Sequence, residues 1–286
     1  MKQNLKISVI GLGSMGSSIY NRLKKKGFNV FGYDNNLELT KSKKEINYKN
    51  IDYILEVSDV ILFAVPSNKE ILNIIENKIL KFNSTYIDLT TSNPQNTLEL
   101  YKYLKLKNIS YFDAAMSGGA SGALNGTLTL MIGGKKEELK YLTKIFSSMA
   151  SNVFYYGNIG NGHSMKLLHN SVCHGIFLMM CEIGNLGEEL GISLEDLINT
   201  FNCSNARSYI SQERFPNHIL NKKFDGKSII KNLKKDLQLV KDFSDSKETS
   251  NNYIKLTSSL LNDFNNKLDL NDFTEIYKLW NKNIVK

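Results

Sequence analysis

A glycine-rich stretch between two strand-like runs limits the possible folds of this chain more than any other feature. It follows the β-branched run at residues 7–10 directly and has the sequence Gly11-Leu12-Gly13-Ser14-Met15-Gly16. A helical pattern then continues to Gly27, and a second apolar run, residues 28–33, ends in Asp34. In such a unit the first glycine permits a tight turn, the second lets a phosphate approach the backbone, and the third lets helix and strand pack closely. Because strand, helix and acid all occupy their expected places, we predict that all six residues of the stretch bind a dinucleotide, rather than forming a plain turn.

The residues after the second run indicate which dinucleotide binds. A carboxylate at Asp34 accepts hydrogen bonds from the ribose hydroxyls and repels a 2′-phosphate. Asn35 and Asn36 follow, and no arginine stands among them to pair with such a phosphate. We therefore expect NAD in preference to NADP, with Asp34 and Asn35 at the ribose. A turn formed by the asparagines would explain these two residues but not the position of the acid.

Strand-like and helix-like runs alternate through the first 156 residues. Further strands are expected at 59–65, 85–89, 110–113, 128–132 and 153–156, and helices at 69–80, 94–107 and 135–149. This alternation predicts the α/β class, with a doubly wound, mostly parallel Rossmann sheet over residues 1–160. Ligands gather at the carboxyl ends of the strands in such sheets. We therefore expect Val65, Pro66 and Thr91 near the cofactor.

The segment 117–126, between two expected strands, contains four glycines. A structureless linker is one interpretation of this composition. Consecutive glycine amides beside a serine hydroxyl are, however, good donors for a carboxylate or a developing oxyanion. We favour an anion-binding loop that begins with Ser117, Gly118 and Gly119.

Only helical patterns follow residue 156. The longest, at 160–191, is apolar almost all round, which fits a helix buried on every side. Lys166 and Asn170 stand four residues apart near its start and so share one face. Taken alone, this stretch favours a lysine that snorkels to solvent beside a capping asparagine; the rest of the chain reverses that preference and favours a functional pair. We expect residues 161–286 to form an all-α domain linked by this helix, which is partly buried in the partner of a homodimer or homotetramer.

Composition excludes several other classes of protein. The net charge is +8, but the lysines are scattered among acids and asparagines without the aromatic interleaving of a base-stacking groove. We expect no nucleic-acid partner, although a positive field favours an anionic substrate. Three cysteines without CxxC spacing predict a reducing compartment, the cytoplasm, and no metal site. No uncharged apolar run is long enough to span a bilayer, so we expect no membrane association.

These segments, in this order, resemble the β-hydroxyacid dehydrogenase family over essentially the whole chain. The resemblance is carried by GLGSMG from residue 11, TTSNP from 90, FDAAMSGGASGALNGTLTLMIGG over 112–134, GNGHSMKLLHN over 160–170 and KKDLQLV over 234–240. It implies an NAD(P)-dependent enzyme that acts on the CH–OH group of a small carboxylate, with Lys166 as general acid and base. It also implies that Asn170 holds the substrate and that Ser117, Gly118 and Gly119 grip its carboxylate. Lys235 would close over nicotinamide and substrate, and Val65, Pro66 and Thr91 would line the cofactor.

The resemblance leaves the substrate open. Segment 211–240 is similar to L-threonate and D-erythronate dehydrogenases, which implies a four-carbon sugar acid; a 3-hydroxyisobutyrate-like acid is the other candidate. Alternatives are a reductase of glyoxylate, succinic semialdehyde or tartronate semialdehyde and, from another class, a non-catalytic scaffold, against which Lys166 argues. The family usually has glutamine at His163 and asparagine at His169. We assign no catalytic role to these histidines or to His174, because lone histidines on helices are more often packing residues.

Overall fold

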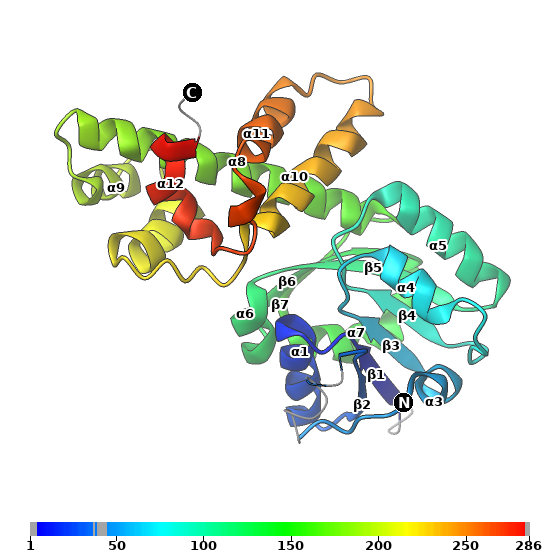
Figure 1. Ribbon diagram of the computed structural model, residues 1–286. Helices are drawn as coiled ribbons and strands as arrows, with labels where there is room; N and C mark the ends of the chain where they lie inside the picture. Colours follow the sequence, from blue (N-terminus) through cyan, green and yellow to red (C-terminus); the bar gives the residue numbers. More distant parts are fainter. Residues whose placement is uncertain (1–4, 37, 39–44, 284–286) are drawn as a thin grey trace. The chain divides into compact units, whose positions relative to one another are not determined.

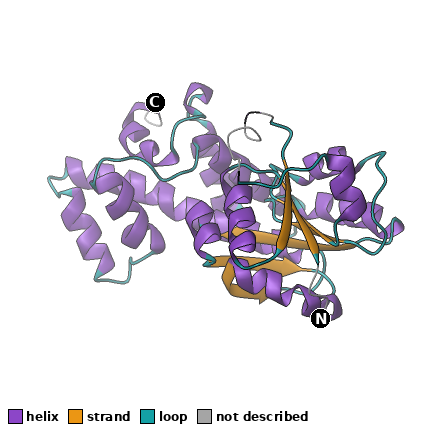
Figure 2. Ribbon diagram, turned by 90° about the horizontal axis from the view of Figure 1, so that it is seen from below, coloured by secondary structure: helices purple, strands orange, loops and turns teal. Residues whose placement is uncertain are grey.

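The computed structural model describes residues 5–36, 38 and 45–283 of the chain. It divides the chain into two compact units, Met1–Lys166 and Leu167–Lys286, whose helices and strands are drawn in Figure 1. Each unit has its own hydrophobic core. The strands lie in the first unit, and the described part of the second consists of helices joined by loops (Figure 2). The two architectures are the α/β and all-α ones that the sequence predicts.

The first unit is built on a seven-stranded sheet with the order β2-β1-β3-β4-β5-β6-β7. The strands are β1 (Lys6–Ile10), β2 (Asn29–Tyr33), β3 (Val60–Phe63), β4 (Thr85–Asp88), β5 (Ser110–Ser117), β6 (Leu128–Gly133) and β7 (Ala150–Tyr155). Neighbours from β2 to β5 are parallel, β6 runs antiparallel to β5, and β7 runs parallel to β6. This confirms the predicted mostly parallel sheet. The chain leaves β1 toward β2 and returns to its other side at β3, which is the switch point where doubly wound sheets bind ligands.

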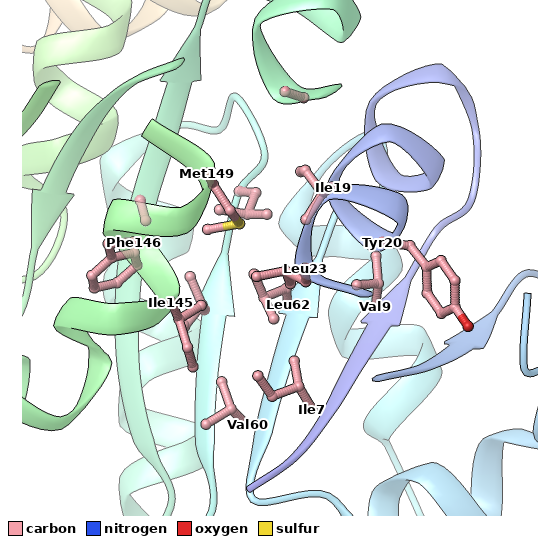
Figure 3. Packing of buried hydrophobic residues seen from close by; sticks show 14 of the residues in the cluster. Ile7, Val9, Ile19, Tyr20, Leu23, Val60, Leu62, Ile145, Phe146 and Met149 are labelled. Carbon is pink, nitrogen blue, oxygen red and sulfur yellow. The ribbon is translucent and has the colours of Figure 1, made fainter. Parts of the chain in front are cut away.

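Helices cover both faces of this sheet (Figure 1). One face carries α1 (Ser14–Lys25), α6 (Gly119–Asn125) and α7 (Leu139–Met149), and the other carries α3 (Ile51–Val57), α4 (Asn68–Ile75) and α5 (Pro94–Leu106). Successive strand residues point to opposite faces, so Val60 and Leu62 pack toward α1 and α7 (Figure 3). Their neighbours Ile61 and Phe63 belong to the core under α3, α4 and α5.

Two short helices of the first unit differ from the expectation. The segment interpreted as a glycine-rich loop is the end of β5 at Ser117 followed by α6. The turn between them uses positive φ angles, +122° at Gly118 and +63° at Gly119, which glycine adopts without strain. Helix α3 was not expected at all; Asn50 caps it by accepting a hydrogen bond from the Tyr53 amide at 2.7 Å. At seven residues each, both helices are too short for their periodicity to stand out.

The long helix α8 (Asn161–Glu189) begins in the first unit and continues through the second. It is followed by α9 (Leu194–Asn202), a π-helical segment (Ile210–Leu220), α10 (Ile230–Asp245), α11 (Asn252–Asn262) and α12 (Ile276–Asn283), with single 3₁₀ turns at Asn266–Leu268 and Phe273–Glu275. A further 3₁₀ turn, Lys136–Glu138, precedes α7 in the first unit. Aromatic rings fill the second core, where Phe177 packs on Phe215 and Phe273. Ser193 and Asp196 form the capping pair that starts α9, with the Asp196 amide 3.1 Å from the Ser193 hydroxyl.

Within one chain, α8 is not buried on every side as its composition suggests. Leu167, Phe177, Leu178 and Cys181 are buried. A second stripe is exposed and consists of Leu168, Val172, Met179, Ile183 and Leu186, with the exposed Leu190 directly after the helix. Among the described residues, no helix has the length and apolarity needed to cross a membrane.

Candidate functional site

Gly11 and Gly16 are required by the packing of the protein itself. Gly11 has a φ of +88°, and a Cβ there would lie 2.5 Å from the carbonyl oxygen of Ala64, just after β3. A Cβ on Gly16 would lie 1.8 Å from the carbonyl oxygen of Gly11. Both distances are far below van der Waals contact, so these glycines allow the β1–α1 turn to lie against the end of β3.

Gly13 differs from both. Its φ is −59°, which any residue can adopt, and a Cβ there would meet nothing within 4 Å. Glycine is therefore not needed at this position by any described residue, and the open space lies at the amino end of α1. No described side chain caps that end, which leaves the first-turn amides of Ser14 and Met15 available to an anion. A methyl group on residue 13 would occupy the space in front of these amides.

Asp34 is tied to the same glycine-rich turn. One carboxylate oxygen accepts a hydrogen bond from the Leu12 amide at 2.6 Å, and the other accepts one from the Asn36 amide at 2.8 Å. Asp34 is half-buried and Asn35 is exposed. The two backbone bonds fix the carboxylate, while each oxygen retains a lone pair for a ribose hydroxyl.

The remaining predicted residues of the first unit lie at the ends of neighbouring parallel strands. Val65 and Pro66 follow β3, Thr91 follows β4, and Ser117 ends β5. Val65 is packed against the glycine-rich turn, since its side chain would be 3.0 Å from a Cβ on Gly11. The carboxyl ends of parallel strands share one edge of a sheet, so topology brings these residues to the edge that carries the β1–α1 turn.

Lys166 is half-buried in the second turn of α8, four residues before Asn170. In the second unit, Asn170 is only 4% exposed and its amide is held from both ends. Its Nδ2 donates to Asp236 on α10 at 2.8 Å, and its Oδ1 lies 2.9 Å from Nδ1 of His169. The asparagine predicted to hold the substrate is therefore fixed in orientation.

Asp236 joins the two predicted substrate residues of the second unit, Asn170 and Lys235, and no sequence motif predicts this role. Besides its bond to Asn170, it lies 3.7 Å from Nζ of Lys235 and 3.5 Å from Nε2 of His174. Burial by itself lowers the pKa of His174, but its hydrogen bonds with Asp236 and Cys173 outweigh burial and raise that pKa above its usual value. The only signal in the sequence was the position of Asp236 directly after Lys235. Nothing in the spacing joined it to Asn170, 66 residues earlier.

Comparison with known proteins matches both halves of the chain. A family model described as the NAD binding domain of 6-phosphogluconate dehydrogenase matches residues 6–157. A second, described as NAD-binding of NADP-dependent 3-hydroxyisobutyrate dehydrogenase, matches residues 160–280.

The described residues contain no group of three or more His, Cys, Asp or Glu side chains that could hold a metal ion.

Individual relatives agree with these matches. The 2-(hydroxymethyl)glutarate dehydrogenase of Eubacterium barkeri is 27% identical over 84% of this chain and 82% of its own length. The mitochondrial 3-hydroxyisobutyrate dehydrogenase of Mus musculus is 30% identical over 76% of this chain and 67% of its own length. A solved 3-hydroxyisobutyrate dehydrogenase of Mycobacterium tuberculosis with L-serine has the same fold, with a TM-score of 0.88, 20% identity, and coverage of 97% of this chain and 99% of that one.

Proposed function

Because this chain belongs to the β-hydroxyacid dehydrogenase family of NAD(P)-dependent enzymes, we propose that it moves a hydride between nicotinamide and a small hydroxy acid, with Lys166 as general acid and base. The observation that carries the proposal is the placement of Lys166 one helical turn before Asn170, whose amide is locked by Asp236 and His169. An amine and an oriented amide on one helix face suit a substrate with a hydroxyl group.

Each residue has a separate role in this proposal. The bound nicotinamide supplies the site that accepts or delivers the hydride. During oxidation, Nζ of Lys166 takes the proton from the substrate hydroxyl, and during reduction it returns that proton to the new alkoxide. Asn170 orients the hydroxyl, and the positive charge of Lys235 favours an anionic substrate. The Ser117 hydroxyl and the amides of Gly118 and Gly119 bind the carboxylate.

We further propose NAD as the preferred cofactor, because the Asp34 carboxylate is held at the turn that would bind the nucleotide. A 2′-phosphate next to this fixed negative charge would be repelled. We expect wild-type kcat/KM to be at least about tenfold higher with NAD than with NADP, and Asp34→Ala to reduce that ratio to near one. Each tenfold step corresponds to about 1.4 kcal/mol of differential binding. A wild-type enzyme that favours NADP would contradict this assignment.

For the substrate, the names of the two relatives share one chemical unit. Both 3-hydroxyisobutyrate and 2-(hydroxymethyl)glutarate carry a hydroxymethyl group on the carbon next to a carboxylate. We propose a substrate of this kind, and keep four-carbon sugar acids as the second candidate because of segment 211–240. The test is a panel of both acid types, with glyoxylate and the semialdehydes for the reverse reaction, followed by nicotinamide absorbance. A chain that binds NAD but turns over no member of the panel would instead favour the scaffold interpretation.

The exposed stripe on α8 supports a homodimer or homotetramer as the assembled form. Its members recur at helical spacing from Leu168 to Leu186, and an exposed apolar stripe of this length is unusual on a monomer. We expect the double variant Val172→Glu and Met179→Glu to dissociate the oligomer to monomers in light scattering, because the charges would be buried in the interface. Leu106→Glu, on α5 at a side chain that is 85% exposed, is the matched control and should leave the mass unchanged. An unaltered mass for the double variant would place the interface elsewhere.

A further inference from the structure

The start of α8 is held by a carboxylate from a strand far away in the sequence. Asp113, on β5, is fully buried. Its Oδ1 accepts a hydrogen bond from the Gly160 amide at 2.8 Å, and its Oδ2 accepts one from the His163 amide at 2.9 Å. Amides at the start of a helix have no carbonyl partner within the helix, so Asp113 supplies the acceptors that they lack. Its negative charge also lies where the helix dipole favours an anion.

The backbone around this contact is too tightly packed to slide. A Cβ on Gly162 would lie 2.4 Å from the Met131 carbonyl oxygen and 2.8 Å from that of Asp113. A Cβ on Gly133 would lie 2.6 Å from Oδ1 of Asp113. The first turn of α8 therefore rests directly on the backbone of β5 and β6, with the carboxylate enclosed between glycines.

The ring of His163 provides a second attachment, which resists rotation of the helix about its axis. The ring is fully buried; its Nδ1 lies 2.7 Å from the Thr97 hydroxyl and its Nε2 lies 3.7 Å from Oδ1 of Asp88. A lone pair on Nε2 would be repelled by the carboxylate, so we assign the proton of the ring to Nε2, facing Asp88. Asp88 also accepts hydrogen bonds from the Tyr111 hydroxyl at 2.7 Å and the Thr90 amide at 2.9 Å.

Both buried carboxylates are thus compensated, and the compensation of Asp113 depends on α8. Burial, together with Asp88 and Asp113, holds the pKa of Tyr111 well above its usual value, so its hydroxyl remains a donor. Asp113, in contrast, has two donors at the start of α8: the amide of Gly160, directly before the helix, and that of His163 in its first turn. An asparagine at position 113 would have one acceptor oxygen and one NH₂ group. The NH₂ group would face the N–H of Gly160 or of His163, so two donors would meet with no acceptor between them.

We propose that Asp113 is a positioning residue for Lys166, which lies three residues after His163 on the same side of α8. By accepting hydrogen bonds from the amides of Gly160 and His163, Asp113 fixes the first turns of α8 along and about the helix axis. The position of the Lys166 amine depends on that placement. The inference rests on the proposed role of Lys166. We call the contact of Asp113 with the amides of Gly160 and His163 the Asp113 clamp. Displacing a reacting group by about 1 Å can cost about a hundredfold in rate, so loss of the Asp113 clamp should lower kcat.

Asp113→Asn is the main test. With NAD and the acid of highest kcat/KM from the panel, we expect kcat to fall about ten- to hundredfold, while the Kd for NAD and the substrate KM change less than about twofold. Hydrogen exchange of the amides in 160–166 should become at least about tenfold faster, since either Gly160 or His163 loses its acceptor on residue 113 and the first turn opens more often. Asp59→Asn is the matched control: Asp59 accepts a backbone bond from Lys6 and pairs with Lys81 at the amino end of the strands. It should change neither kcat nor exchange in 160–166. Wild-type kcat or unchanged exchange in Asp113→Asn would overturn the proposal.

His163 provides a second pair of variants in case Asp113→Asn does not fold. His163→Gln keeps a donor toward Asp88 and an acceptor toward Thr97, and it should retain most of the wild-type kcat. His163→Leu fills similar space without either group and should lower kcat about tenfold at unchanged NAD affinity; a His163→Leu enzyme with wild-type kcat would overturn the proposal. The exchange measurement does not depend on turnover. If the wild-type enzyme turns over no acid but exchange in 160–166 is faster in Asp113→Asn, the Asp113 clamp is supported and the proposed function is wrong.

Discussion

Replacing Lys166 with alanine should lower kcat by about a hundredfold or more, the range for loss of a general acid or base. Alanine is the best helix former, and Lys166 is only half-buried in the second turn of α8, so the variant should fold as wild type does. NAD affinity, measured by fluorescence titration, should remain within about twofold, because the turn proposed to bind the dinucleotide is unaltered. Lys144→Ala, an exposed lysine on α7, is the matched control and should keep full turnover.

A second substitution separates proton transfer from charge. Lys166→Arg keeps a positive charge, but a guanidinium does not release its proton at neutral pH. If Lys166 transfers a proton, the arginine variant should be about as slow as the alanine variant. An arginine variant with most of the wild-type kcat would mean that position 166 acts through charge alone, and unchanged turnover in both variants would refute the assignment.

The parts of the fold that follow from local periodicity were predictable. The strands of the parallel sheet are short β-branched runs between helical patterns, and both the strand positions and the glycine-rich turn agree with the expectation. Short elements were not predictable in the same way, because α3 and α6 contain only two turns each. In α6, four glycines in ten residues indicated a loop, although its Ala-Ser-Gly-Ala-Leu sequence forms a helix once Gly118 and Gly119 make the turn.

The connections within the candidate site were beyond prediction for a different reason. Asp113 is separated from His163 by 50 residues and Asp236 from Asn170 by 66. Sequence spacing reports which residues share a face of one element, but not which element lies across from it. Spacing also does not report what covers a helix. The apolar residues of α8 are spread around the helix, but only some of them are buried within its own chain. The sequence therefore predicted the residues that are proposed to contact ligands. The residues that hold those side chains in place, such as Asp113 and Asp236, were identified only from the structure.

Of two alanine substitutions in the glycine-rich turn, only one should lower the stability of the protein. Gly16→Ala should destabilise the first unit severely, because its Cβ would lie 1.8 Å from the Gly11 carbonyl oxygen and neither α1 nor the turn can move away without losing its packing. We expect poor solubility or a large fall in the thermal midpoint by circular dichroism. Gly13→Ala should leave the midpoint unchanged, because its φ is −59° and a Cβ there would meet nothing within 4 Å.

The effect of Gly13→Ala should appear only when a dinucleotide binds. A methyl group in the space at the amino end of α1 would separate the pyrophosphate from the amides of Ser14 and Met15. Steric overlap of this kind costs about 1–3 kcal/mol, so the Kd for NAD should rise about ten- to hundredfold. Adenosine alone, which lacks the pyrophosphate, should bind both proteins equally and provides the control ligand. Equal NAD affinity in wild type and Gly13→Ala would mean that the open space at Gly13 does not receive the phosphates, since no contact within the described protein requires glycine there.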